Sequence, residues 1–236
     1  SVGVRRADEV ISFETLGALG RSSYLALLAC LVTISVALIL SQLMRGKNGK
    51  LLRAVTRISS LGYALPGTVL GIGVLVPFGQ LDQWINRVAT SFAGVGPGLL
   101  FSGGVFAVVF AYATRFLIIA VSHVEDGMEK IPSNYDHVAR TLGRSKAFIF
   151  RSIHLPLLKP SIVSAMLLVF VDAMKELPAT LILRPFDFET LATRVFSLAS
   201  LGQYESAAIP ALLIVLAGFI PVMVLSRNLR HATSAT

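Results

Sequence analysis

The feature that most constrains this chain is its set of long stretches without a charged residue. They run from Tyr24 to Met44, from Ile58 to Leu81, from Val88 to Thr114 and from Ser206 to Ser226. A further stretch, near 157–176, has an uncharged centre and charged ends. About 20 apolar residues in a helix cross a bilayer, and backbone groups in lipid must pair within their own segment. The sequence therefore predicts an all-α integral membrane protein.

Composition agrees with a polytopic helical bundle. Hydrophobic residues make up 54% of the chain and charged residues 14%, whereas soluble domains carry about 25% charged residues. We expect about five spans in one transmembrane domain, residues 1–236. The expected spans lie near residues 24–44, 58–78, 99–121, 157–176 and 207–226.

The net charge of +8 is distributed as an orientation signal. Lys and Arg gather in the loops 45–57 and 121–159 and in the C-terminal tail, and cytoplasmic loops carry such an excess. This places the N-terminus outside and the C-terminus inside. Basic and aromatic residues do not interleave as they do in nucleic-acid-binding proteins, so nucleic acid is excluded as a partner.

The N-terminal segment predicts that the chain is a fragment. Residues 1–23 are polar, show no signal-peptide pattern and begin without Met. An outside chain end needs a signal or an earlier span. We expect at least one earlier span to be missing.

Candidate catalytic and metal-binding residues are scattered. Cys30 stands alone in a span, which excludes an internal disulfide and a cysteine metal cluster. His123, His137, His154 and His231 fall in loops or the tail, so no Ser–His pair lies at one depth for an intramembrane protease. No P-loop motif is present. We expect no catalytic site, no metal site and no cofactor.

The insert at residues 133–160 carries the most specific pattern. Ser133 and Asp136 fit a capping box for a helix over 134–142, which would end at Gly143 because glycine tolerates the left-handed C-terminal position. Ser145 would cap a second short helix that ends near Ile153. The residues Pro156 and Pro160 would mark the start of the next span.

The side chains of the insert suit a docking element. The basic ones are Arg140, Arg144, Lys146 and Arg151, and the apolar ones are Val138, Leu142, Phe148 and Ile149. One interpretation is that two short helices dock onto a cytoplasmic partner. The alternative is a plain basic loop beside the membrane.

A resemblance favours docking. Gly143, nine residues and then Ile153-x-Leu155-Pro156 resemble the EAA loop of bacterial ABC importer permeases. The E-A-A positions are His137, Val138 and Ala139, of which only the last matches; Asp136 would supply the acidic group. The segment 172–194 is similar to the ferric-iron permease group, which makes this chain resemble the C-terminal half of a two-half permease.

The resemblance implies a translocation subunit, not an enzyme, in a bacterial inner membrane. ATP hydrolysis would belong to a separate cytoplasmic subunit, with a second permease half, an extracytoplasmic substrate-binding protein and the lipid bilayer as further partners. The residues implied to couple to the ATPase are Asp136, His137, Val138, Ala139, Arg140, Leu142, Gly143, Ile153, Leu155 and Pro156.

The resemblance implies ferric iron as the solute. Related permeases serve thiamine, phosphonate, sulfate or polyamine, so these solutes remain alternatives. An ion-coupled secondary transporter is the rival class, since it too has glycine-broken spans. That class has no reason to carry the insert.

Ionisable residues within spans are functional candidates. Arg115 is expected to snorkel toward the inner headgroups, with a functional role as the alternative. Asp172, Lys175 and Glu176 are spaced to share one helix face. Two interpretations stay open for them, an interfacial ion pair or part of the substrate path at the outer gate.

Two further patterns predict packing. Gly62, Gly67, Gly71 and Gly73 lie in one apolar run, and the Gly67–Gly71 spacing allows close helix contact. The segment 188–199 reads as an amphipathic helix on the outer face. It is expected to pack on the membrane or the spans, with contact to a binding protein as the alternative.

Overall fold

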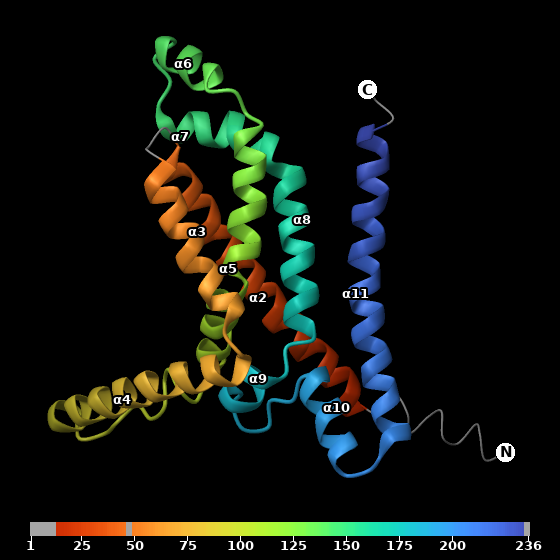
Figure 1. Cartoon of the computed structure of the whole chain (residues 1–236). Helices are drawn as coiled ribbons and strands as arrows, with labels where there is room; N and C mark the ends of the chain where they lie inside the picture. The colour runs from red at the N-terminus through yellow and green to blue at the C-terminus, as the bar shows by residue number, and fades with distance from the viewer. Residues whose placement is uncertain (1–12, 46–48, 234–236) are drawn as a thin grey trace.

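The computed structural model describes residues 13–45 and 49–233, and among these residues every regular element is helical. Figure 1 shows them arranged as an elongated helical bundle. The helices are α2 (Phe13–Met44), α3 (Gly49–Ala64), α4 (Gly67–Ala93), α5 (Val105–Glu129), α6 (Asn134–Thr141), α7 (Lys146–Ile149), α8 (Leu155–Met174), α9 (Pro178–Leu183), α10 (Leu191–Ser200) and α11 (Tyr204–Thr233), with a π-helical turn η1 (Phe150–His154) between α7 and α8.

The centre of the bundle is formed by α2, α5 and α8, each of which packs on the other two. Small side chains such as Ala26, Ala29, Ala107 and Ala111 are fully buried there. Small residues at the contact let helix backbones approach closely, which is how helices associate in lipid. Helix α3 packs on α5, while α11 packs on α8 and α10.

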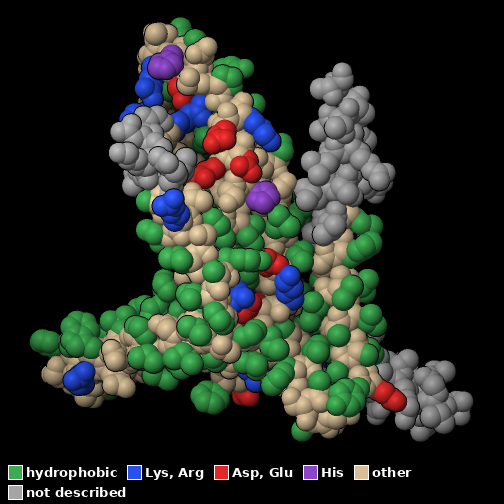
Figure 2. Space-filling view, viewed as in Figure 1, with side chains coloured by type: hydrophobic (Ala, Val, Ile, Leu, Met, Phe, Trp, Pro, Cys, Tyr) green, Lys and Arg blue, Asp and Glu red, His purple; other side chains and the backbone are tan. Residues whose placement is uncertain are grey.

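The bundle has two different ends. We call the end with α6 and α7 the insert end, and the end with α9 and α10 the far end (Figure 1). Figure 2 shows hydrophobic side chains over the middle of the molecule and over α4, whereas charged and histidine side chains gather at the insert end. This distribution is that of a protein with a lipid-facing belt and one polar, water-exposed end.

Three of the predicted spans are confirmed as helices long and apolar enough to cross a membrane. They are α2, α5 and the continuous stretch Lys146–Met174 that joins α7, η1 and α8. The third predicted span starts at Val105, not at residue 99, because residues 94–104 form an irregular loop. The last predicted span lies within α11, of which Tyr204–Phe219 is an apolar helical segment.

The predicted span near 58–78 is not one continuous helix. Thr56–Ala64 and Gly67–Phe92 are two helices bent by 106° at the break between them. Pro66 at this point cannot donate a backbone hydrogen bond and disfavours helical geometry at Leu65. Helix α4 therefore leaves the bundle and extends sideways from its far end (Figure 1).

The outer part of α4 is held to the loop that returns to α5. The Asp82 carboxylate is fully buried and accepts backbone N–H groups of Leu100, Phe101 and Ser102 at distances from 2.8 to 3.2 Å. The Asn86 amide also bonds both backbone groups of Gly98. The loop is held to α4 because several of its backbone N–H groups meet at this one buried carboxylate.

Candidate coupling site

The insert folds largely as its sequence indicates. Helix α6 ends before Gly143, which has a φ of +71°, the left-handed conformation in which glycine is the preferred residue. The Ser145 hydroxyl accepts the N–H of Phe148 at 3.3 Å and so caps α7. The predicted turn and the predicted second cap are both confirmed.

Two local predictions for the insert are wrong. Ser133 has helical backbone angles and makes no capping bond with its side chain, because the N–H of Asp136 is donated to the Ser133 carbonyl at 3.0 Å instead. The second short helix does not end near Ile153 but runs through η1 into α8, with Leu155 donating to the Phe150 carbonyl. Pro156 cannot donate the next helical bond, and such an interruption favours a π-turn.

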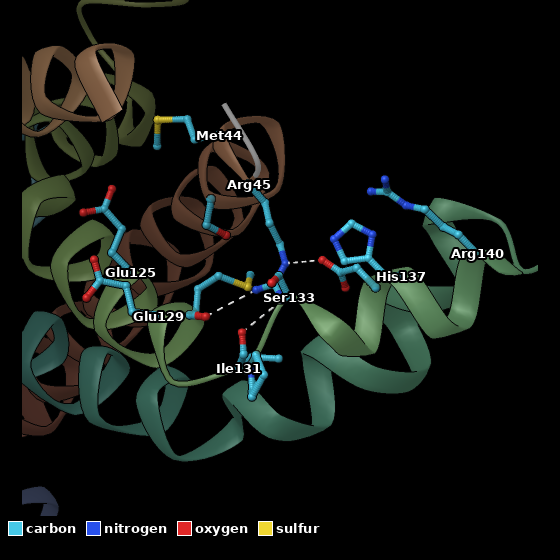
Figure 3. Close-up of a pocket in the computed structure, with 12 residues that line it drawn as sticks. Met44, Arg45, Glu125, Glu129, Ile131, Ser133, His137 and Arg140 are labelled. Carbon is cyan, nitrogen blue, oxygen red and sulfur yellow. Dashed lines mark hydrogen bonds and ion pairs between the residues drawn. The ribbon is translucent and has the colours of Figure 1, made fainter. Parts of the chain in front are cut away.

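Asp136 is the centre of a polar cluster that joins four elements. Its Oδ2 accepts from Arg45 Nε at 2.5 Å, and its Oδ1 accepts from His154 Nε2 at 2.7 Å. Gln42 Nε2 lies 2.7 Å from His154 Nδ1. The Arg45 guanidinium also donates to the carbonyls of Met128 and Ile131, as Figure 3 shows. The cluster thus ties α6 to the end of α2, to η1 and to the end of α5.

The cluster favours the ionised form of Asp136. Burial alone would raise the pKa of this carboxyl, but the hydrogen bonds and charges of Arg45 and His154 outweigh it and hold the pKa below its usual range. With the Gln42 amide nitrogen as the donor, His154 accepts through Nδ1 and donates to Asp136 through Nε2.

Figure 3 looks into a hollow of about 690 Å³ at this end of the bundle. It lies between the end of α2, the end of α5 and the start of α6. Glu125 and Glu129 line one side, and His137 and Arg140 line the other (Figure 3). Three of the residues implied to couple, Asp136, His137 and Arg140, therefore border this hollow.

The outward face of the insert is apolar. Tyr135, Val138, Leu142 and Phe148 are exposed. They border a groove of about 630 Å³ together with Ile153. The prediction that Ile149 is an apolar contact residue of the same kind is wrong, because its side chain is buried.

The remaining implied coupling residues lie on other sides. Ala139 is buried beneath the exposed face of α6. Leu155 and Pro156 are exposed at the start of α8. The implied set therefore divides into an outward surface, an inward anchor at Asp136 and the start of a long helix.

The three candidates for the substrate path do not share one face. Asp172 pairs with Lys175 at 2.8 Å, but Glu176 is buried. Helix α8 ends at Met174, so the chain has already turned at Glu176. Its Oε1 accepts the N–H of Ala179 at 3.3 Å.

Arg115 does not snorkel toward the insert end. Its Nε lies 3.5 Å from Glu176 Oε2, and its NH1 donates to the Leu65 carbonyl at 3.4 Å. Arg115 is thus directed to the break between α3 and α4.

The prediction that the glycines of the apolar run 62–73 serve close helix packing is confirmed in part. Gly67 and Gly71 lie in close contact with residues around α9, while Gly73 faces open space.

The predicted helix near 188–199 is confirmed as α10, which packs on α11 and α2. Thr190 and Thr193 form a capping box at its start. Arg194 pairs with Glu189 at 3.1 Å and with Glu14 of α2 at 2.7 Å. These contacts agree with packing on the spans.

Sequence reasoning missed Arg45, Gln42 and His154 as partners of Asp136. Arg45 was available as the first charge after an apolar run, and His154 as the only histidine close to the Ile153-x-Leu155-Pro156 motif. Neither observation predicts that Asp136 is the partner, because Arg45 lies 91 positions from Asp136 in the sequence and His154 lies 18 positions from it.

Comparison with known proteins gives the family. Residues 23–234 match the family described as "Binding-protein-dependent transport system inner membrane component". The Fe(3+)-transport system permease protein FbpB 2 of Haemophilus influenzae is 31% identical over 214 residues, which are 91% of this chain and 39% of that protein. The molybdenum transport system permease protein ModB of Mycobacterium tuberculosis is 28% identical over 204 residues, 85% of this chain and 74% of the relative.

A solved structure shows the same fold. It is the crystal structure of a bacterial alginate ABC transporter in complex with an alginate pentasaccharide-bound periplasmic protein. One of its chains superposes with a TM-score of 0.69 at 14% identity, over 94% of this chain and 81% of that one. With a family match over most of its length, this chain belongs to the binding-protein-dependent transport system inner membrane components and is a multi-pass protein of the bacterial inner membrane.

Proposed function

We propose that this chain is the membrane-spanning subunit of an ATP-driven importer, and that α6 receives the movement of a separate cytoplasmic ATPase subunit. The observation that carries the proposal is the two-sided character of the insert. Its outward side presents apolar side chains to the solvent end of the molecule. Its inward side is fixed to the long helices through Asp136.

The inward cluster explains how movement would pass into the membrane. A displacement of α6 carries Asp136 with it, and Asp136 holds Arg45 at the end of α2 and His154 in η1. Because η1 continues into α8 without a break, two of the three central helices would follow α6. Hydrogen bonds to ionised groups are short and strong enough to act as such a link.

The other partners follow from the same proposal. The insert end would face the cytoplasm, because cytoplasmic loops are rich in Lys and Arg. The far end would then receive a solute from an extracytoplasmic binding protein. A second permease half would complete the pathway.

For the solute we propose ferric iron. Support comes from the segment 172–194, which is similar to ferric-iron permeases, and from the relative whose name states Fe(3+) transport. Ferric iron prefers oxygen ligands. Asp172 and Glu176 are carboxylates near the far end of α8, where brief contacts with a passing ion would be made.

An oxyanion is the second candidate, and a specific observation favours it. Both carboxylates already have cationic partners, Lys175 and Arg115. A relative is named as a molybdenum permease. Positive side chains beside the pathway would suit an anion better than a trivalent cation.

The docking proposal is tested with two matched substitutions, Leu142→Asp and Leu201→Asp. Both leucines are 72% exposed, the first on the insert and the second at the far end. In the assembled importer, Leu142→Asp should abolish co-purification of the ATPase subunit and ATP-dependent uptake, with membrane insertion unchanged. Leu201→Asp should leave ATPase co-purification intact. Equal ATPase recovery with both variants would refute docking at α6.

The solute is tested by uptake into sealed vesicles that contain the complete importer. Radioactive ferric citrate and molybdate are offered separately, with and without ATP and binding protein. ATP-dependent accumulation of iron alone supports the ferric assignment. Accumulation of molybdate alone replaces it with the oxyanion and leaves the docking proposal untouched.

A further inference from the structure

The second half of α4 extends beyond the bundle. The first half packs on α9, where a Cβ atom on Gly71 would lie 3.2 Å from Ile182 Cβ. From residue 80 on, α4 runs beside the loop that returns to α5 (Figure 1). We call residues 80–104, the outer half of α4 with this loop, the arm.

The helical part of the arm has one apolar and one polar side. With 3.6 residues per turn, its apolar residues fall within one sector of the helix and most of its polar residues within the opposite one. The apolar sector consists of Leu81, Trp84, Ile85, Val88 and Phe92, and the polar side carries Gln83, Asn86, Arg87 and Thr90. In the apolar sector, Leu81, Trp84, Val88 and Phe92 are exposed. A continuous exposed apolar surface of this kind marks an interaction site.

The arm is held together by its own hydrogen bonds. The Asp82 carboxylate accepts backbone N–H groups of residues 100–102, and the Asn86 amide bonds both backbone groups of Gly98. Backbone groups that lie against lipid must be paired within the protein, because lipid offers them no partner. The loop meets part of this requirement inside the arm, without a second protein.

The arm starts at the depth where the hydrocarbon layer should end. In α5, Val105 stands 20 residues before Glu125, which borders the polar hollow at the insert end. About 20 helical residues span about 30 Å, which is the thickness of the hydrocarbon layer. Phe78, just before the arm, packs on Phe106 in the first turn of α5, with ring centroids 5.6 Å apart. The arm therefore lies near the layer's boundary at the far end.

The arm runs along this boundary instead of across it. Helix α4 is bent by 106° from α3, and it lies nearly perpendicular to the long helices (Figure 1). Figure 2 shows hydrophobic side chains along the side of the arm that is turned toward the insert end, and a basic side chain toward its other side. Since the bilayer lies between the two ends of the bundle, the apolar side of the arm is turned toward the acyl chains.

We propose that the arm is an interfacial anchor that binds the phospholipid surface at the far end of the protein. Its apolar sector lies among the upper parts of the acyl chains, and Arg87 with the other polar side chains faces the headgroups, as in amphipathic helices that lie in the membrane plane. Trp84, the only tryptophan of the chain, has the side chain that is most typical of this depth. The inference depends neither on the solute nor on the docking of an ATPase.

Spin labels along the arm test the proposal. The complete importer, with Cys30→Ser and with one cysteine at a time at positions 80–92, is labelled and reconstituted into vesicles of phosphatidylethanolamine and phosphatidylglycerol. Molecular oxygen concentrates among acyl chains, whereas the nickel complex Ni-EDDA stays in water. Collisions with oxygen should be several-fold more frequent at 81, 84, 88 and 92 than at 83, 87 and 90. Collisions with Ni-EDDA should show the opposite pattern.

Two other patterns would overturn the anchor. Rare collisions with both reagents at Leu81, Trp84 and Val88 would show that a protein surface, such as the second permease half, covers the apolar sector. Frequent collisions with Ni-EDDA at every position would show that the arm stands in water.

A matched pair of lysine substitutions tests the same assignment from the side of charge. Val88→Lys places a cation in the apolar sector, and Gln83→Lys places the same cation on the polar side. With the label at Leu81→Cys, Val88→Lys should lower the oxygen collision rate several-fold, because a charge is unfavourable among acyl chains. Gln83→Lys should leave that rate unchanged. Equal oxygen collision rates in the two variants would show that lipid does not hold the arm.

Discussion

Asp136 shows how one side chain can change the meaning of a motif. It lies one residue before the E-A-A positions, and the structure turns it away from the surface where a partner would dock. Its two oxygens are occupied by Arg45 and His154. The acidic group of this insert therefore holds α6 to the bundle. In the docking proposed above, contact with the partner would be left to the apolar side chains of the outward face.

Replacing Asp136 should loosen the insert end. In Asp136→Asn, Arg45 loses its carboxylate partner in a mostly buried site, which costs about 1–3 kcal/mol. The melting temperature of the purified complex should fall. Glu129→Gln is the control, since Glu129 is an exposed carboxylate that borders the same hollow, and it should leave the melting temperature within error. An unchanged melting temperature in Asp136→Asn would show that the cluster does not hold α6.

Acid should weaken the same cluster. The pKa of Asp136 is lowered in the folded protein, so the folded state binds this proton less readily than the unfolded state. Its stabilisation is complete above the usual carboxyl pKa near 4 and is lost as the pH falls through the depressed pKa. Melting curves between pH 6 and pH 3 should therefore show a steeper acid loss in the wild type than in Asp136→Asn. Parallel acid losses would contradict the assignment.

Gly143 should respond to backbone conformation and not to space. Its φ is +71°, and nothing lies within 4 Å of where a Cβ atom would be. Gly143→Val should cost about 1 kcal/mol or more through backbone strain, whereas Gly143→Asn should cost less because Asn tolerates the left-handed region. ATP-dependent uptake should drop more in the Val variant than in the Asn variant, with equal membrane insertion of both. Equal uptake by both would mean that the turn does not position α6.

Residue-scale features were predictable where they depend on near neighbours. The turn at Gly143 and the cap at Ser145 involve residues within a few positions of each other, and both predictions are confirmed. The partners of Asp136 and Arg115 were not predictable. They are brought together only when helices far apart in the sequence pack, and a single sequence holds no record of that packing.

At the scale of elements, the sequence predicts apolar helices but not how they bend. Hydropathy sums side-chain character over a window, so the run from Ile58 to Leu81 looks like one span. Pro66 within it ends α3, and α4 departs at 106°. Pro66 and Pro178 were visible signals for two breaks, one before α4 and one at the start of α9, since a proline after a helix opposes its continuation.

Glycines in the bent pair should differ in their tolerance of alanine. A Cβ atom on Gly62 of α3 would strike the carbonyl of Thr114 in α5, and its distance to the Thr114 carbonyl carbon would be 3.1 Å. Backbone atoms cannot move aside cheaply, so Gly62→Ala should reduce the yield of folded protein. Gly73→Ala in α4 meets nothing within 4 Å and should leave it unchanged. Size-exclusion chromatography of both variants makes the comparison, and similar profiles would contradict the close approach of α3 to α5.

At the scale of the whole molecule, the distribution of charge and the direction of the helices agree. Helix α2 runs from the far end to the insert end, α5 runs the same way, α8 runs back, and α11 again ends at the level of the insert (Figure 1). The basic loops predicted to be cytoplasmic include the whole insert. The polar end in Figure 2 is therefore the end that the positive-inside rule assigns to the cytoplasm.

This orientation predicts opposite accessibility for the two ends. Asn134 starts α6 and is exposed, and Phe186, between α9 and α10, is 99% exposed at the far end. In a Cys30→Ser background, Asn134→Cys should react with a membrane-impermeant maleimide only after the cells are opened. Phe186→Cys should react in intact spheroplasts, where the outer surface of the inner membrane is accessible. Asn48, a further expected cytoplasmic position, lies outside the described residues. Labelling of Asn134→Cys in intact spheroplasts would invert the topology, and the insert would then face away from any cytoplasmic ATPase.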